Sequence, residues 1–126
     1  MKINVYFDGG TRGNRACFVV DDGVSVIEKK IGIIRAPQTN NQLEYIALLG
    51  VLRFIKRAKY NIFDILIKGD SQLIIRHLKG GYKVKSKKLI DLNEQARLLI
   101  GELGFPIYNL FWVPRSENLA GIELEK

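Results

Sequence analysis

Three acidic residues stand where their carboxylates could act together. Asp8 follows the apolar segment 3–7, Asp70 follows the apolar segment 63–67, and Glu44 lies about one turn into a predicted helix. If the two segments are parallel neighbouring strands, Asp8 and Asp70 leave the sheet at the edge where ligands bind in open α/β folds. Three converging carboxylates repel one another unless a cation lies between them. Oxygen ligands without His or Cys favour Mg²⁺ or Mn²⁺, and paired ions of this kind suit in-line phosphodiester hydrolysis.

Each of these acids also has an ordinary structural interpretation. An Asp beside Gly at a strand end, as at Asp8, is common turn chemistry. Asp70 before Ser71, and Glu44 near a helix start, could simply belong to the first turns of helices. The spacing alone therefore leaves both interpretations open.

The elements that must position the acids are predicted from apolar periodicity. Strands are predicted over 3–7, 16–20, 24–34, 63–67 and 107–113, and helices over 42–59, from Ser71 to about Lys79, and over 87–103. Asn40 or Asn41 is the predicted cap of the first helix, and a polar stretch is predicted after the last strand. The crossover through the first helix requires a parallel strand pair, so the sheet is mixed. We expect residues 1–126 to form one α/β domain with helices covering at least one face of the sheet.

Composition limits the class of protein. A chain of 126 residues that is 47% hydrophobic can form one core without disulfides, and its one cysteine, Cys17, cannot make an internal bridge. No apolar run approaches the ~18 residues of a membrane helix, and the N-terminus lacks the features of a signal peptide, so a cytoplasmic protein without membrane contact is expected. The net charge of +7 indicates either a polyanionic partner or a generally basic surface.

Four local sequences resemble those of type-1 ribonuclease H, in the same order along the chain. They are D-G-G-T-R-G-N from Asp8, T-N-N-Q-L-E-Y-I-A-L from Thr39, G-D-S-Q-L from Gly69 and W-V-P-R-S-E-N from Trp112. The resemblance implies a ribonuclease H-like fold, with a five-stranded mixed sheet of order 3-2-1-4-5 flanked by helices. It also implies a metal-dependent endonuclease that hydrolyses the RNA strand of RNA–DNA hybrids and leaves 3′-hydroxyl and 5′-phosphate ends.

The resemblance further implies residue roles. Asp8, Glu44 and Asp70 would ligate two Mg²⁺ ions, with Mn²⁺ as a substitute, in a protein expected to be a monomer. The residues expected to bind the substrate are Gly10, Thr11, Arg12, Gly13, Asn14, Thr39, Asn40, Asn41, Gln72 and Arg115. Short polar groups in the minor groove can recognise the RNA 2′-hydroxyl. A further basic set could follow the DNA backbone or form a solvated surface, namely Arg76, Lys79, Lys83, Lys85, Lys87 and Lys88.

The chain departs from the family pattern near its C-terminus. The family carries a fourth acid in a pattern like N-x-x-A-D, whereas alignment on Asn118 puts Gly121 or Ile122 at that position. Glu123 or Glu125 could replace the acid from a shifted position, or both could be exposed in a short tail. Without a fourth acid the metal site is weaker, so the enzyme would be slower, prefer Mn²⁺ or be inactive.

The family's loop histidine is also missing. Arg115 lies nearest its place, and the single histidine, His77, is predicted to have a packing or surface role. Three functions stay open: a hybrid-specific endonuclease, a nuclease of the same fold that also accepts duplexes such as double-stranded RNA, and a weakened or non-catalytic nucleic-acid-binding domain.

Overall fold

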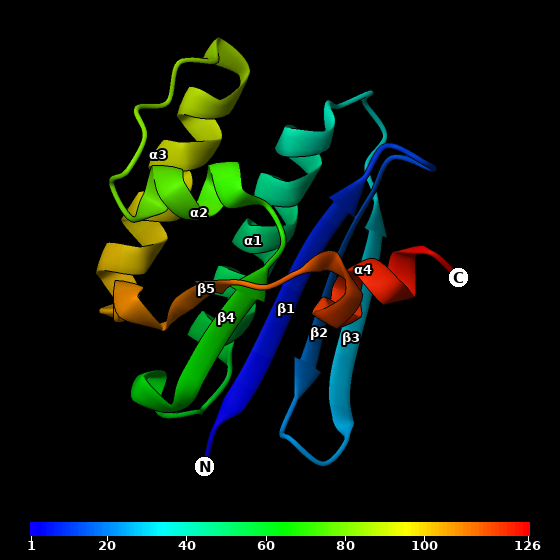
Figure 1. Cartoon of the computed structure of the whole chain (residues 1–126). Helices are drawn as coiled ribbons and strands as arrows, with labels where there is room; N and C mark the ends of the chain where they lie inside the picture. The colour runs from blue at the N-terminus through cyan, green and yellow to red at the C-terminus, as the bar shows by residue number, and fades with distance from the viewer.

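One five-stranded mixed sheet organises the computed structural model, which describes residues 1–126 (Figure 1). Strands β1 (Ile3–Gly10), β2 (Arg15–Asp21) and β3 (Val26–Ile33) form an antiparallel meander. Strand β4 (Ile65–Gly69) pairs in parallel with β1, and β5 (Leu110–Trp112) pairs in parallel with β4. The order β3-β2-β1-β4-β5 confirms the predicted mixed sheet.

Helices cover both faces of the sheet (Figure 1). Helix α1 (Asn40–Arg57) packs on one face of the sheet, and α2 (Gln72–Leu78) and α3 (Lys87–Leu103) pack against α1. The short α4 (Leu119–Leu124) lies on the opposite face, over β1 and β2. None of these helices has the length and apolar character needed to cross a membrane.

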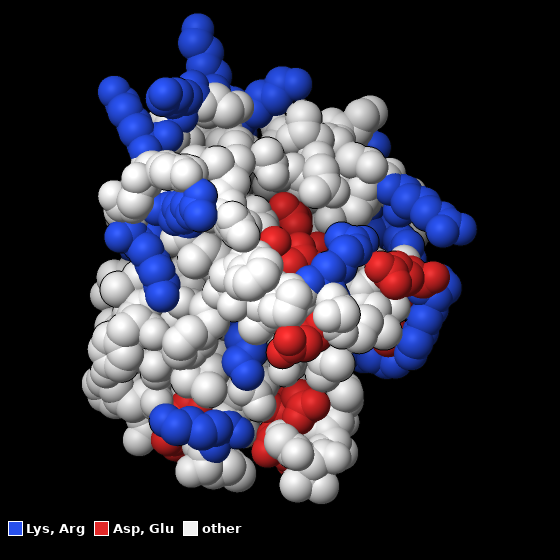
Figure 2. All heavy atoms as spheres, viewed as in Figure 1, with Lys and Arg blue, Asp and Glu red and all other residues white.

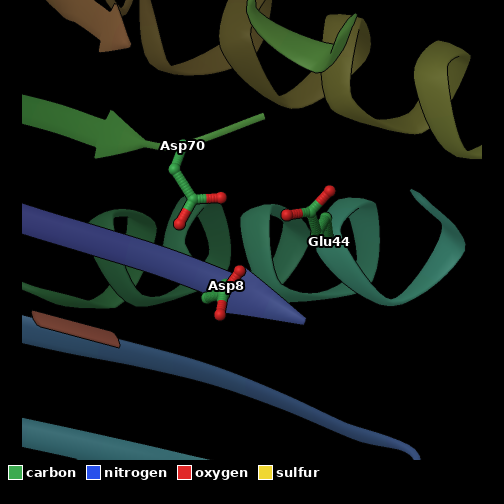
Figure 3. A group of neighbouring side chains, drawn as sticks. All are labelled: Asp8, Glu44 and Asp70. Atoms are coloured by element: carbon green, nitrogen blue, oxygen red, sulfur yellow. The ribbon is translucent and has the colours of Figure 1, made fainter. Parts of the chain in front are cut away.

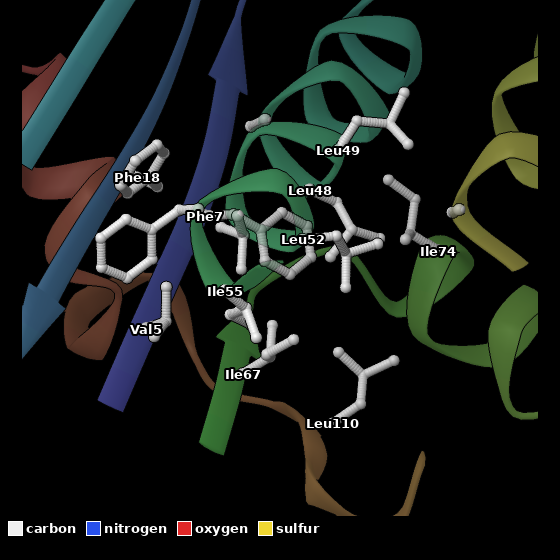
Figure 4. Close-up of a cluster of buried hydrophobic side chains, with 14 of the residues drawn as sticks. Val5, Phe7, Phe18, Leu48, Leu49, Leu52, Ile55, Ile67, Ile74 and Leu110 are labelled. Carbon is white, nitrogen blue, oxygen red and sulfur yellow. The ribbon is translucent and has the colours of Figure 1, made fainter. Parts of the chain in front are cut away.

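The core lies between the sheet and α1 (Figure 4). Alternate residues of β1, such as Val5 and Phe7, point to this side because side chains in a strand alternate between the two faces. Helix α1 meets them with Leu48, Leu52 and Ile55, which recur at helical spacing. A smaller cluster beneath α4 contains Cys17, Val19, Ala120 and Leu124.

The predicted cap of α1 was wrong. Thr39, rather than Asn40 or Asn41, is the N-cap, so the helix begins two residues earlier than predicted. The Thr39 hydroxyl accepts a hydrogen bond from the Gln42 backbone N–H (3.2 Å), and the Gln42 side chain accepts one from the Thr39 backbone N–H (2.8 Å). This reciprocal capping box satisfies two N–H groups at once, which a single Asn cap could not do.

Several element boundaries also differ from prediction. Strand β4 starts only at Ile65, after a 3₁₀ turn over Ile62–Asp64, and β5 starts only at Leu110, after a 3₁₀ turn over Ile107–Asn109. The stretch predicted as polar at the C-terminus instead contains α4, which buries Ala120, Gly121 and Leu124. The helix predicted over 87–103 is confirmed at both ends.

Gly9 generates the first prediction, because α1 crosses β1 at this residue. A Cβ there would lie 2.3 Å from the backbone carbonyl carbon of Leu43 and 2.4 Å from the backbone nitrogen of Glu44. Backbone cannot yield as a flexible side chain does, so we expect Gly9→Ala to lower the free energy of unfolding by about 3 kcal/mol or more in urea titrations. Gly32→Ala is the matched control, since nothing lies within 4 Å of its Cβ position in β3. An equal loss in both variants would contradict this packing argument.

Candidate active site

Asp8, Glu44 and Asp70 converge at the end of β1 (Figure 3). Each offers one carboxylate oxygen, and these oxygens all lie within 4.8 Å of one another. The side chains of Asp8 and Glu44 are buried, with 2% and 5% of their surface exposed, and Asp70 is partly buried. The structure therefore brings together the three acids that the sequence singled out.

The strand register explains the convergence of the two aspartates. Phe7 and Gly69 are partners in the parallel β1–β4 ladder, so Asp8 and Asp70 each follow a paired residue at the same edge. A Cβ at Gly69 would lie 2.5 Å from the Phe7 ring, which shows how closely the two strands pack here. Ser71 then caps α2 through a hydrogen bond from the Ile74 backbone N–H to its hydroxyl, which leaves Asp70 in the turn between strand and helix.

Burial and repulsion from neighbouring acids raise the pKa values of the Asp8 and Glu44 carboxyls. Desolvation first, and then the negative charge of Asp70, raise the pKa of Asp8 to about 6. Desolvation, followed by the charges of Asp8 and Asp70, raises the pKa of Glu44 to about 8. A group of carboxyls that resists ionisation in this way can bind a cation that replaces its protons.

A buried oxygen of Asp8 without a hydrogen-bond partner also indicates a cation site. The Oδ1 atom of Asp8 is buried and has no hydrogen-bond partner. Burying a carboxylate oxygen without a partner is costly, and such atoms are rare in folded proteins. With three hard oxygen donors nearby, Asp8, Glu44 and Asp70 are the residues that could hold a divalent cation.

Asn118 links the C-terminal segment to this centre, and the sequence analysis did not identify that role. Its fully buried amide donates hydrogen bonds to the backbone oxygen of Phe7 (3.0 Å) and to Oδ2 of Asp70 (3.0 Å). Its carbonyl oxygen accepts from the backbone N–H of Ala120 (3.1 Å), which caps α4. Asn118 thus fixes one oxygen of Asp70 and the start of α4 at the same time.

Gly121 faces the centre at the place where a fourth acid was expected. A Cβ at this residue would lie 3.2 Å from Oδ2 of Asp8 and 3.6 Å from Oδ2 of Asp70. Glu123 does not replace the missing acid, because its carboxylate pairs with Lys29 (2.9 Å) and Lys126 (3.2 Å).

Glu125 also forms an ion pair with another residue and is not part of the group of three acids. Its carboxylate pairs with Arg115 at 3.2 Å. Glu123 lies two residues after Gly121 in α4, about 200° around the helix, so its side chain points away from the direction that position 121 faces. In this structure Glu123, the predicted additional ligand, is paired with lysines and does not join the three acids.

Most residues predicted to bind substrate lie close in sequence to one of the three acids, but one of them is used inside the protein. Asn14 donates both amide hydrogens, to the backbone oxygens of Ile34 and Ala36, and its carbonyl oxygen accepts from the Gln38 backbone N–H (3.2 Å). Asn14 therefore ties the β1–β2 turn to the segment that leads into α1, and its amide hydrogens are not free for RNA. The other predicted residues of these segments remain exposed or partly exposed, namely Gly10, Thr11, Arg12, Gly13, Thr39, Asn40, Asn41 and Gln72.

Arg115 lies within the electrostatic influence of the acids. Partial burial would lower the pKa of its guanidinium, but Asp8 and the ion pair with Glu125 outweigh this effect and raise it. His77 lies elsewhere and is buried, joined to the Tyr45 hydroxyl by a hydrogen bond of 2.8 Å. The predicted packing role of His77 is confirmed.

A basic groove lies at the start of α1, the helix that carries Glu44. Its volume is about 630 Å³, and its lining includes Thr39, Asn41, Leu73, Lys83, Lys85 and Lys88. Figure 2 shows basic side chains gathered over this loop and on the opposite edge of the molecule, with carboxylates in the hollow between them. This charge arrangement suits a polyanion that spans the centre.

The raised carboxyl pKa values predict how stability depends on pH in the absence of metal. The folded protein holds more protons than the unfolded protein between the ordinary carboxyl pKa of about 4 and the raised values near 6 and 8. In EDTA the melting temperature should therefore fall as pH rises through this interval, and Glu44→Gln should reduce the fall. The exposed Glu102→Gln is the control, and an identical fall in all three proteins would contradict the assignment. Mg²⁺ added at pH 8 should raise the melting temperature of the unmutated protein.

Comparisons with known proteins agree with this geometry. Residues 12–124 match a family model described as Reverse transcriptase-like. The chain is 36% identical over 123 residues to Ribonuclease HI of Halobacterium salinarum, and the match covers 93% of this chain. The same match covers 59% of that protein, so the chain spans less than two thirds of the relative's length.

Two solved structures are similar along almost the whole chain. RNase H1 from the same archaeon superposes with a TM-score of 0.77 at 28% identity, covering 99% of this chain and 98% of that one. LC11-RNase H1, isolated from compost and solved in complex with an RNA/DNA hybrid, superposes with a TM-score of 0.74 at 29% identity, covering 94% and 89%. The chain belongs to the reverse transcriptase-like family and has the fold of ribonuclease H1.

Proposed function

We propose that this protein is a metal-dependent endonuclease that hydrolyses the RNA strand of RNA–DNA hybrids. The observation that carries the proposal is the group of three buried or half-buried carboxylates within 4.8 Å at the sheet edge of a ribonuclease H fold. The hybrid bound to LC11-RNase H1 supports the substrate class.

Asp8, Glu44 and Asp70 would hold Mg²⁺, with Mn²⁺ as a substitute, and two ions are expected once substrate is present. A divalent ion bound by carboxylates supplies Lewis-acid activation of water and stabilises the leaving oxygen. The hydrolysis adds a water oxygen to phosphorus and breaks the bond to O3′, which leaves with a proton as a 3′-hydroxyl opposite a 5′-phosphate. Asn118 holds one Asp70 oxygen in place throughout, and Arg115 lies where it can attract the phosphate.

The two strands of the hybrid would lie on different surfaces. The turn from Gly10 to Gly13, Asn40 and Gln72 would contact the RNA, where backbone groups and short polar side chains can approach a 2′-hydroxyl. Thr39, Asn41 and the lysines of the basic groove would contact the DNA phosphates, which an electrostatic site recognises without regard to sequence.

Gly121 is the observation that favours a second possibility, a weakened nuclease or a domain that binds nucleic acid without cutting it. The residue beside Asp8 and Asp70 contributes no oxygen, so this chain would offer a bound cation one carboxylate fewer at that place. No further helix lies between α2 and α3, and so small a binding surface also favours tolerance of other duplexes such as double-stranded RNA.

The direct test is cleavage of a labelled hybrid in Mg²⁺, in Mn²⁺ and in EDTA. We expect cuts in the RNA strand only, none in EDTA, and a loss of at least about 100-fold in Asp70→Asn, because removing a charged ligand weakens the metal site. Cleavage of double-stranded RNA of the same sequence, measured in parallel, shows whether the protein accepts duplexes other than the hybrid. Salt-sensitive binding without cleavage in either metal would sink the enzyme proposal and leave the binding domain.

Gly121 provides a gain-of-function prediction. Gly121→Asp places a fourth carboxylate beside Asp8, whose flexible side chain can shift to relieve the 3.2 Å contact. We expect the affinity for Mg²⁺ in calorimetric titration to rise about tenfold and cleavage to accelerate at limiting Mg²⁺, because one more oxygen replaces water. Gly121→Ala is the matched control, since it adds the Cβ without the charge. A gain of the same size in Gly121→Ala would show that helix stability, and not the carboxylate, is responsible.

A further inference from the structure

Aromatic and cationic side chains alternate on the surface beside Asp70, where α2 meets β5. The α2–β5 patch consists of Arg76, Lys79, Phe111 and Trp112, all of them exposed. We propose that the α2–β5 patch binds a single-stranded extension of the RNA strand whose paired part is held at the carboxylates. This inference rests on the proposed function and adds a preferred form of substrate.

Trp112 ties the patch to the centre. Trp112 lies opposite Gly69 in the β4–β5 ladder, and its indole N–H donates to the backbone oxygen of Asp70 at 3.1 Å. The ring is therefore held in one orientation although 45% of its surface is exposed, so stacking on it costs little further side-chain entropy. A shallow hollow of about 180 Å³ lies between this ring and Gln72, Ile75 and Arg76 of α2.

The cations lie directly over or beside aromatic rings. The Lys79 ammonium lies 5.5 Å from the centre of the Phe111 ring, and the Arg76 guanidinium lies 5.0 Å from the centre of the Tyr82 ring. Phe111 is 37% exposed and Tyr82 is 49% exposed. Each of these two rings thus has a cation over it, next to the exposed ring of Trp112, and aromatic rings beside cations are the combination that binds a base and its phosphate together.

This chemistry favours single-stranded nucleic acid over a duplex or a protein. Bases in a duplex are stacked on one another and offer no free face to Trp112 or Phe111, whereas an unpaired base does. The hollow is too small for a helix. The three-residue β5 is also too short to pair securely with an added strand. The patch contains two cations and no acid, which suits a phosphate backbone. Because Trp112 contacts Asp70, the strand that reaches the patch from the carboxylates is the RNA strand that would be cut.

The test compares binding of the full chain to hybrids that differ only in an unpaired extension. Blunt hybrid, hybrids with ten extra RNA nucleotides at the 5′ or 3′ end, and a hybrid with a DNA extension are titrated in EDTA by fluorescence anisotropy. We expect one of the RNA extensions to tighten binding about fivefold or more. Trp112→Ala should remove that increment and Trp112→Phe should restore part of it. Tyr108→Ala is the control, since Tyr108 is 66% exposed at the other end of β5.

Arg76→Gln with Lys79→Gln is a second variant that changes only exposed side chains, and it should also reduce the increment. No tightening by either RNA extension, or an equal effect of the DNA extension, would overturn the proposal. Cleavage of the blunt hybrid in Mg²⁺ is measured separately. If the blunt hybrid is cut but extensions add nothing, the α2–β5 patch assignment fails alone. If extensions bind tightly but nothing is cut, the proposed hydrolysis fails and the patch stands.

Discussion

Mutual repulsion among three carboxylates is the constraint on which the rest of the structure depends. Asp8, Glu44 and Asp70 come from β1, α1 and the end of β4, and the packing of those elements, with the hydrogen bond from Asn118 to Asp70, keeps their oxygens within 4.8 Å. Helix α1 approaches β1 closely at Gly9, and β4 approaches β1 closely at Gly69 and Phe7. These close contacts lie next in sequence to the three mutually repelling carboxylates. Stability is given up at the centre and recovered in the core around it, as is common at functional sites.

The C-terminal segment closes the centre from the opposite face of the sheet. Asn118 bonds to Phe7 and Asp70, Arg15 donates to the backbone oxygen of Leu124 (2.6 Å), and Lys29 pairs with Glu123. These contacts hold α4 over β1 and β2 without adding an acid. The C-terminal segment therefore orients Asp70 through Asn118. It places no side chain beside Asp8 and Asp70 at Gly121, where only backbone is present. Charge repulsion at the centre is lower than it would be with a fourth carboxylate, and the binding of a cation is correspondingly weaker.

Strand and helix periodicity predicted most of the elements and a mixed sheet, because those patterns are local in the sequence. The strand order and the choice of the three acids depended on the resemblance of four short motifs to ribonuclease H, since spacing alone left the acids open. Side-chain pairings between residues distant in sequence were not predicted. Asn14 bonds to a segment about 20 residues away, Asn118 bonds to Phe7, and Glu123 pairs with Lys29, and none of these pairings can be inferred from spacing. The cap at Thr39 is a different case, because the T-x-x-Q pattern was present and could have identified it.

The basic rim and the acidic centre together imply that substrate and metal bind in a mutually dependent way. The net charge of +7 attracts a polyanion, but a phosphate brought to the centre meets Asp8, Glu44 and Asp70 at close range, where salt screens little. A divalent cation there removes the repulsion and a phosphate adds oxygen ligands for the cation, so each must strengthen the binding of the other by the same factor. With no carboxylate at Gly121, a bound cation would be held by Asp8, Glu44 and Asp70 alone among the acids of this chain, so a phosphate oxygen would be a larger fraction of its ligands. The absence of the fourth acid would therefore weaken the free metal site more than the site occupied by substrate.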